Sequence, residues 1–141
     1  MGFSISATAA IIGVSFLMIL EISMGTLFPV ITNIDESYDN MRERAINELQ
    51  TDIEIHNISV QANSSLHDLS IQVKNTGSTT IKVSNVDLLI NGTLSSFTCS
   101  NQYWFPENTY ELSVYGLSGS GLKKVKIITY NGISDYDTYS T

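Results

Sequence analysis

The sequence predicts a long N-terminal helix followed by an antiparallel β-sandwich, so one α element precedes an all-β domain. Three observations predict this fold. Residues 2–20 carry no charge, apolar residues then recur at helical spacing as far as Leu49, and from Ile53 onward apolar and polar residues alternate as in a strand. We therefore expect a transmembrane helix anchor over 1–34, an amphipathic stalk helix over 35–52 and a β-sandwich domain over 53–141.

The first segment has the length and composition of a membrane span. Nineteen uncharged residues, Gly2 to Leu20, make a helix of about 28 Å, close to the thickness of a hydrocarbon core of about 30 Å. A secretory signal peptide has a basic start, whereas residues 1–4 contain no Lys or Arg. We therefore expect the helix to stay on the mature protein as an anchor. A buried core helix is not expected, because the rest of the chain offers no helical layer that would cover it.

Two features of the span indicate contacts with other membrane helices. Glu21 lies at the membrane boundary if the span ends near Leu20, but in the hydrocarbon if the span continues to Ile31, where an ionised acid costs about 3 kcal/mol or more and needs a partner. Both interpretations remain open. Small residues also recur at helical spacing and would allow another helix to approach closely. These residues are Gly2, Ser6, Ala9 and Gly13.

The second segment predicts an amphipathic helix about 25 Å long that continues from the membrane. Its apolar positions are spaced by 4, 3, 4 and 4 residues: Ile34, Tyr38, Met41, Ala45 and Leu49. Residues 35–52 also hold six acids and two arginines. The apolar stripe either packs on the C-terminal domain or forms a short coiled coil between two copies; we expect a homodimer.

The third segment alternates apolar and polar residues in seven places, separated by turn sequences such as Asn91-Gly92 and Asn131-Gly132. Six to eight short strands without helices between them must pair antiparallel and bury one face of each sheet. An immunoglobulin-like sandwich follows, although the paired cysteines of immunoglobulin domains are absent. Trp104 is expected in its core. The alternating positions are Ile53/Ile55, Ile58/Val60, Leu69/Ile71/Val73, Ile81/Val83, Val86/Leu88/Ile90, Tyr110/Leu112/Val114 and Val125/Ile127.

Composition and motifs argue against several function classes. Asp and Glu outnumber Lys and Arg by 14 to 7, and no segment is basic enough to bind nucleic acid. The single cysteine, Cys99, has no zinc-type spacing with His56 or His67, which we expect at the surface. Neither a catalytic motif nor a cofactor motif is present, and Asp135 with Asp137 makes only a weak cation site. We therefore predict a non-enzymatic protein without metal or cofactor.

Three N-x-S/T sequons favour a C-terminal domain on the extracytoplasmic side, because only there can they accept glycans. They begin at Asn57, Asn63 and Asn91. The acids Asp35, Glu36 and Asp39, which precede the first arginine, favour the same orientation weakly.

The opening MGFSISATAAII and two stretches of the predicted β-domain, KNTGSTTI (Lys74–Ile81) and VDLLINGT (Val86–Thr93), resemble a known family. They are similar to the flagellin-related accessory proteins of the archaellum, FlaF (also called ArlF) and FlaG, which are related to archaellins. The resemblance implies a stator component that anchors the motor to the cell envelope by binding S-layer protein, with a FlaG-like archaellum protein and the membrane as further partners.

Two other function classes stay open. Archaellins and type IV pilins have a short basic leader and a glutamate a few residues into the mature chain. Here no leader is seen and the acid is at Glu21, so a filament subunit is the second choice. An anchored receptor, the third class, predicts a concave ligand pocket in the β-domain.

Overall fold

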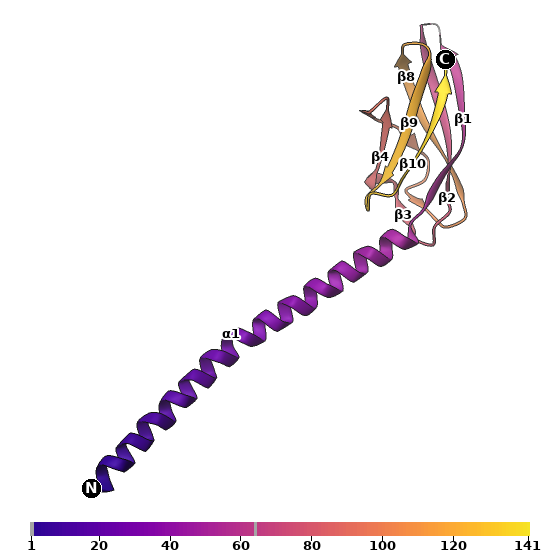
Figure 1. Cartoon of the computed structure of the whole chain (residues 1–141). Helices are drawn as coiled ribbons and strands as arrows, with labels where there is room; N and C mark the ends of the chain where they lie inside the picture. Colours follow the sequence, from indigo (N-terminus) through magenta and orange to yellow (C-terminus); the bar gives the residue numbers. More distant parts are fainter. Residues whose placement is uncertain (1, 64) are drawn as a thin grey trace. The chain divides into compact units, whose positions relative to one another are not determined.

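A computed structural model describes residues 2–63 and 65–141 of the chain. Met1, where the mature anchor is expected to begin, and Ser64, the middle residue of the second sequon, lie outside the described residues. The chain divides into two compact units, one ending at Glu43 and one running from Arg44 to Thr141. Each unit is described by itself (Figure 1).

The helix α1 spans Gly2–Gln50 without interruption and passes through Pro29. Its 49 residues give a length of about 74 Å at the helical rise. Hydroxyl groups in its apolar part donate to carbonyls one turn earlier; Ser6 donates to Gly2 (3.1 Å), Thr8 to Ser4 (2.9 Å) and Ser15 to Ile11 (2.8 Å). Because these bonds satisfy the hydroxyls within the helix, they reduce the cost of placing them in lipid.

Among the described residues, α1 is the one helix long and apolar enough to cross a membrane. Its apolar window has a mean hydropathy of 2.1 and none of that window is buried by the rest of the chain. The helix thus has the composition of a membrane span without the cover that a core helix would need.

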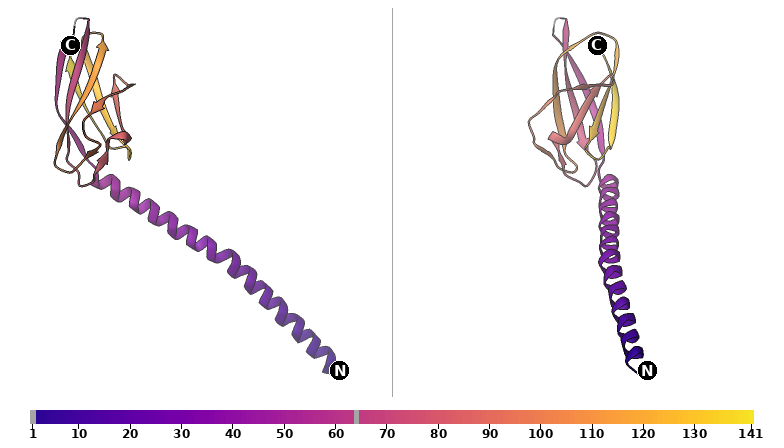
Figure 2. Two further views of the ribbon diagram at one scale, coloured as in Figure 1. Left: turned by 180° about the vertical axis from the view of Figure 1, so that it is seen from behind. Right: turned by 90° about the vertical axis from the view of Figure 1, so that its left-hand side faces the viewer.

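The β-domain consists of two four-stranded antiparallel sheets whose inner faces enclose one hydrophobic core (Figure 2). Sheet 1 has the order β1-β2-β8-β6, sheet 2 the order β10-β9-β4-β5, and β3 pairs with β7 in a small two-stranded sheet. The predicted fold class, a long apolar helix followed by an antiparallel sandwich, is confirmed. The strands are β1 Ile53–Asn63, β2 Leu66–Asn75, β3 Ile81–Lys82, β4 Val86–Ile90, β5 Thr93–Ser95, β6 Thr98–Cys99, β7 Tyr103–Trp104, β8 Thr109–Ser118, β9 Leu122–Thr129 and β10 Ser134–Ser140, with a 3₁₀ turn at Val83–Asn85.

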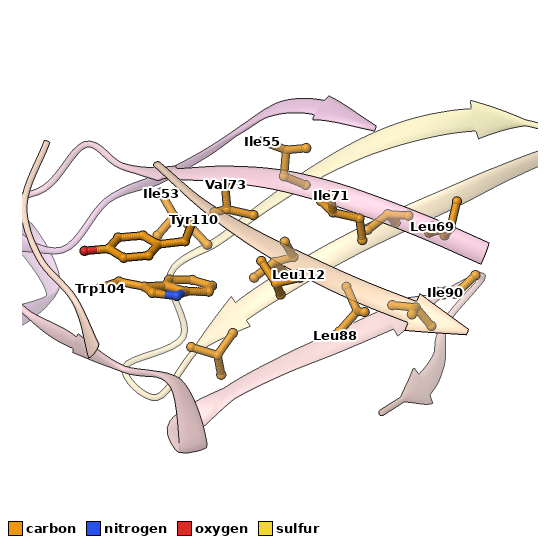
Figure 3. Packing of buried hydrophobic residues seen from close by; sticks show 14 of the residues in the cluster. Ile53, Ile55, Leu69, Ile71, Val73, Leu88, Ile90, Trp104, Tyr110 and Leu112 are labelled. Atoms are coloured by element: carbon orange, nitrogen blue, oxygen red, sulfur yellow. The ribbon is translucent and has the colours of Figure 1, made fainter. Parts of the chain in front are cut away.

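The core forms where the alternating apolar residues point inward from both sheets (Figure 3). Of the seven predicted sets, Ile58/Val60 and Val83 are only partly buried, and the other positions are buried. Trp104 is completely buried, as predicted, and its ring stacks on Tyr110 with centroids 5.8 Å apart and planes 16° apart. Stacking two large rings against each other adds a favourable aromatic contact to the apolar area that they bury.

The described residues form ten strands rather than six to eight. The additional strands are β5, β6 and β7, which have only two or three residues each, and β10, whose sequence SDYDTYS has one buried apolar residue, Tyr139. Strands this short have no alternation to detect, and β10 is held by its backbone pairing with β9 rather than by an apolar face.

His67 differs from the prediction, because it is only 5% exposed whereas His56 is exposed. His67 is in phase with Leu69, Ile71 and Val73 along β2, so its side chain faces inward with theirs. Its Nε2 lies 3.2 Å from the hydroxyl of Tyr139. Burial lowers the pKa of His67, the nearby Lys123 lowers it further, and Asp68 acts in the opposite direction. Burial also raises the pKa of Tyr139.

Candidate functional site: the apolar helix, its junction and the faces of the sandwich

The structure places Gly2, Ser6, Ala9 and Gly13 on α1, as expected. An added Cβ at Gly2 or Gly13 would meet nothing within 4 Å among the residues that the structure describes, so no contact there requires a glycine. Glycine lowers helix stability relative to alanine by about 1 kcal/mol, and close packing against another helix is one reason to keep it. The stripe formed by these four residues therefore remains a proposed contact surface for a second helix.

Glu21 also lies on α1, but on a different side from the small-residue stripe. At about 100° per residue, its direction is about 90° round the helix axis from the centre of the stripe. One partner helix lying along the stripe would not face Glu21 directly. A contact to Glu21 would therefore need a second neighbour or a polar group at the membrane boundary.

Within the second unit, a network of polar side chains fastens the last turn of α1 to the β-domain. Asn131, in the turn between β9 and β10, donates from Nδ2 to the Asn47 carbonyl (3.2 Å) and to Oγ1 of Thr51 (2.8 Å). Thr51 Oγ1 lies 2.7 Å from the Asn47 carbonyl and 2.8 Å from Thr79 Oγ1. Thr51 is almost completely buried, so these hydrogen bonds replace contacts with water.

The loop between β2 and β3 closes over the same junction. The amide of Ser78 donates to the Gln50 carbonyl (2.8 Å), and the amide of Gly77 donates to the Asp52 carbonyl (3.0 Å). A Cβ on Gly77 would lie 2.4 Å from Asp52 N and 2.5 Å from Gln50 O, so only glycine fits without moving the backbone. Asn75, completely buried, ties this loop to β7 through a bond from Nδ2 to the Trp104 carbonyl (3.0 Å).

We call this set of contacts the junction clasp; its residues are Asn47, Gln50, Thr51, Asp52, Asn75, Gly77, Ser78, Thr79 and Asn131. The stretch KNTGSTTI, which carried much of the family resemblance, supplies four of its nine residues. Sequence reasoning missed the clasp because its partners are up to 84 positions apart. Leu49, the last residue of the apolar stripe, stays 87% exposed beside it and does not pack on the β-domain.

All three sequon asparagines are exposed in the structure, which leaves their side chains accessible to a transferase. Asn57 lies in edge strand β1, and Asn63 ends that strand at the hairpin to β2. Asn91 is in the β4–β5 turn with φ 49°, and its Oδ1 accepts a bond from the Lys124 amide at 2.9 Å. A glycan would attach to Nδ2 and leave this bond intact. Glycosylation at these positions remains a proposal.

The two edge strands β1 and β10 lie beside each other and share a bond. Asp135 of β10 accepts a hydrogen bond from the Ile55 amide of β1 through Oδ2 (2.7 Å), next to a bulge between Ile55 and Asn57. This bond engages one oxygen, Oδ2, of the carboxylate that a cation site with Asp137 would use. It also satisfies a backbone group on an open edge, which limits pairing with other chains at this side.

Open hollows, rather than a deep cleft, mark the surface of the β-domain in its described part. One hollow of about 540 Å³ lies at the end of the domain that contains the β1–β2 hairpin and is lined by Leu66, His67 and Ser120 among others. Two smaller ones, of about 220 and 210 Å³, share Glu111, Ser113 and Tyr115 on the outer face of sheet 1. Such shallow polar hollows differ from the enclosed, mostly apolar sites typical of small ligands.

The fold and the junction together define a class of protein: an apolar helix joined through a buried polar clasp to an antiparallel sandwich. A family model described as archaeal-type flagellin matches residues 2–138, almost the whole chain. The chain therefore belongs to the archaeal-type flagellin family, which confirms the resemblance to archaellum proteins. This family comprises structural components of the archaellum rather than enzymes. No curated protein sequence matches the chain significantly.

Among solved structures, the chain is similar to the archaellum periplasmic stator protein FlaG from Sulfolobus acidocaldarius. The two are 20% identical, the match covers 63% of this chain and 99% of that chain, and the TM-score is 0.52. At this level of identity, the likeness shows a shared fold and nothing further about function.

Proposed function

We propose that this archaeal-type flagellin family member is a stator component, which holds the archaellum motor against the cell envelope by binding S-layer protein. In this proposal the residues 2–34 of α1 anchor the protein in the membrane. The β-domain lies on the extracytoplasmic side and makes the envelope contact. The protein performs no chemistry; it transmits force between lipid and lattice.

The junction clasp is the observation that carries this proposal. A mechanical link fails at its weakest joint, and a helix joined to a domain by a flexible linker would transmit little lateral force. Here Thr51 and Asn75 are buried, and backbone bonds from Gly77 and Ser78 hold the final residues of the helix. The β-domain shares its fold with FlaG, which is described as a periplasmic stator protein, and this likeness supports the same function.

A filament subunit is the second candidate, and one observation favours it. The archaeal-type flagellin model covers the helix as well as the β-domain, from residue 2 to residue 138. In a filament the apolar helix would pack against helices of other subunits instead of lipid. Sheared filaments would then contain the protein, whereas a stator component stays with the cell body.

A binding measurement tests the stator proposal. The full chain in lipid nanodiscs is immobilised and titrated with isolated S-layer protein. Saturable binding that empty nanodiscs lack is the expected result; absence of binding across a range of pH and salt would contradict the proposal.

A labelling experiment tests the orientation separately. Thr98 is exposed on β6 beside the single cysteine. In a Cys99→Ser, Thr98→Cys chain, a membrane-impermeant maleimide is expected to label intact cells as fully as lysed ones. Labelling only after lysis would place the β-domain in the cytoplasm.

A further inference from the structure

The outer face of sheet 2 carries a row of large side chains that the core does not use. The strand registers align Leu94 of β5, Leu89 of β4, Lys126 of β9 and Tyr136 of β10 in one line across the sheet. Side chains in such a line point to the same side of the sheet and touch their neighbours. Ile128 and Lys124 flank the line on β9 and point to the same side.

We call these residues the lysine–leucine face: Leu89, Leu94, Lys124, Lys126, Ile128 and Tyr136. Leu94 is 68% exposed and Tyr136 60%, while Leu89 and Ile128 are half-buried. An exposed group of apolar residues that includes an aromatic ring is typical of a protein-binding surface, since water contact with it is unfavourable.

The charge of this face is opposite to that of the chain. The whole chain has a formal charge of −7, yet the outward row and its flanks hold two lysines and one acid, Asp87. Lys124 Nζ lies 3.7 Å from the centre of the Tyr136 ring, which keeps the ring and the cation together. Over the described residues, no carboxylate lies within salt-bridge distance of Lys126.

The outer face of sheet 1 has a different character. Its central line runs through Ser59, Ser70, Ser113 and Thr98, four hydroxyl side chains in register. Two of the three sequons, at Asn57 and Asn63, lie in β1 at the edge of this sheet, and the third, at Asn91, lies in the β4–β5 turn at the end of sheet 2. The two faces of the sandwich therefore differ in polarity: the central line of sheet 1 consists of hydroxyl side chains, whereas that of sheet 2 combines two leucines and a tyrosine with a lysine.

We infer that the lysine–leucine face is the surface through which the β-domain binds its envelope partner, and that the partner presents an acidic, partly apolar protein surface. This inference rests on the proposed function. Leu94 and Tyr136 supply the apolar contact, and Lys124 and Lys126 pair with carboxylates of the partner. Two copies of this chain meeting through this face would bring four lysines together against two acids, which disfavours a second copy as the partner.

The test compares matched variants of the full chain in nanodiscs, titrated with isolated S-layer protein. Lys126→Glu and Tyr136→Ala change the proposed face. Lys82→Glu gives the same change in net charge on β3, and Tyr115→Ala removes a tyrosine, 68% exposed, from the outer face of sheet 1. Fluorescence of Trp104, the single tryptophan, checks that each variant is folded.

We expect Lys126→Glu and Tyr136→Ala each to weaken binding at least about tenfold, a loss typical of a central interface residue, and the two control variants to bind within about twofold of the original chain. The affinity of the original chain should fall as salt is raised, because the contact pairs opposite charges.

Equal binding by all variants would overturn the inference and leave the stator function standing. No binding by the original chain would overturn both. If sedimentation shows that the original chain self-associates and that Lys126→Glu abolishes this, the face binds a second copy of the chain and the inference is wrong.

Discussion

At the scale of single residues, Gly77 shows how one small side chain determines the junction. Its position between the helix end and the β2–β3 loop leaves no space for a Cβ, since Asp52 N and Gln50 O lie within 2.5 Å of where that atom would be. A larger residue must displace the backbone bonds that hold Gln50 and Asp52. The stability of the junction therefore depends on the absence of a side chain.

Gly77→Ala is expected to lower the free energy of unfolding by about 1–3 kcal/mol, the usual cost of forcing an extra carbon into a filled site. Urea unfolding followed by Trp104 fluorescence measures this loss. The nearby Thr80→Ala is the control: Thr80 is exposed, lies outside the junction clasp and should change stability by less than about 0.5 kcal/mol. Equal effects of the two variants would contradict the role of Gly77.

His67 predicts a pH dependence of stability. Because burial lowers its pKa in the folded state, the unfolded chain binds the proton more readily. The contribution of His67 is therefore complete above its ordinary pKa of 6.5 and is lost progressively as the pH falls from there through the lowered folded-state pKa.

Unfolding in urea between pH 8 and pH 4 should show this loss in the original chain, and a smaller loss in His67→Gln. The exposed His56→Gln serves as the control and should keep the slope of the original chain. The same slope in His67→Gln and the original chain would show that another group is responsible.

At the scale of elements, the strong patterns of the sequence were sufficient to predict the helix and the long strands. The charge-free run and the 3.6-residue period predicted α1, and alternation at positions such as Leu69, Ile71 and Val73 predicted the inner faces of the sheets. Strand β10 was missed because backbone pairing with β9 forms it, despite a mostly polar sequence. His67 could have been placed by extending the alternation of β2 by two residues.

The junction clasp could not be predicted, because its hydrogen bonds join segments that only the folded chain brings together. Asn131 and Thr51 are 80 positions apart, and neither belongs to a recognisable motif. The helix itself places the small-residue stripe and Glu21 on α1, and the partners proposed for them are other membrane helices. The lysine–leucine face likewise requires the strand order, because its residues come from four strands.

Asn131→Ala should loosen the end of the helix. It removes the donor shared by the Asn47 carbonyl and Thr51, and the expected loss is about 1–3 kcal/mol, typical of a broken hydrogen bond at a buried polar group. Hydrogen exchange of the amides between Arg44 and Thr51 should become faster, while exchange in β2 and β8 changes less. The exposed Asn85→Ala is the control; similar exchange in both variants would mean that the clasp does not hold the helix.

At the scale of the whole molecule, the division of labour proposed for the chain follows from its two unlike units. None of the apolar window of the helix is buried in the described residues, and the β-domain has its own hydrophobic core and two outer faces of different polarity. In the proposal, lipid covers the helix and an acidic partner protein binds the outer face of sheet 2. The two candidate functions differ in what covers residues 2–34. Lipid covers them in a stator component, whereas helices of other subunits cover them in a filament.

The intact mass of the native protein, measured in both the membrane fraction and sheared filaments, tests this account most directly. We predict a full-length chain that keeps residues 2–34, recovered with the membranes and absent from the filaments. A shortened chain recovered from the filaments would contradict membrane anchoring and establish a polymerising subunit.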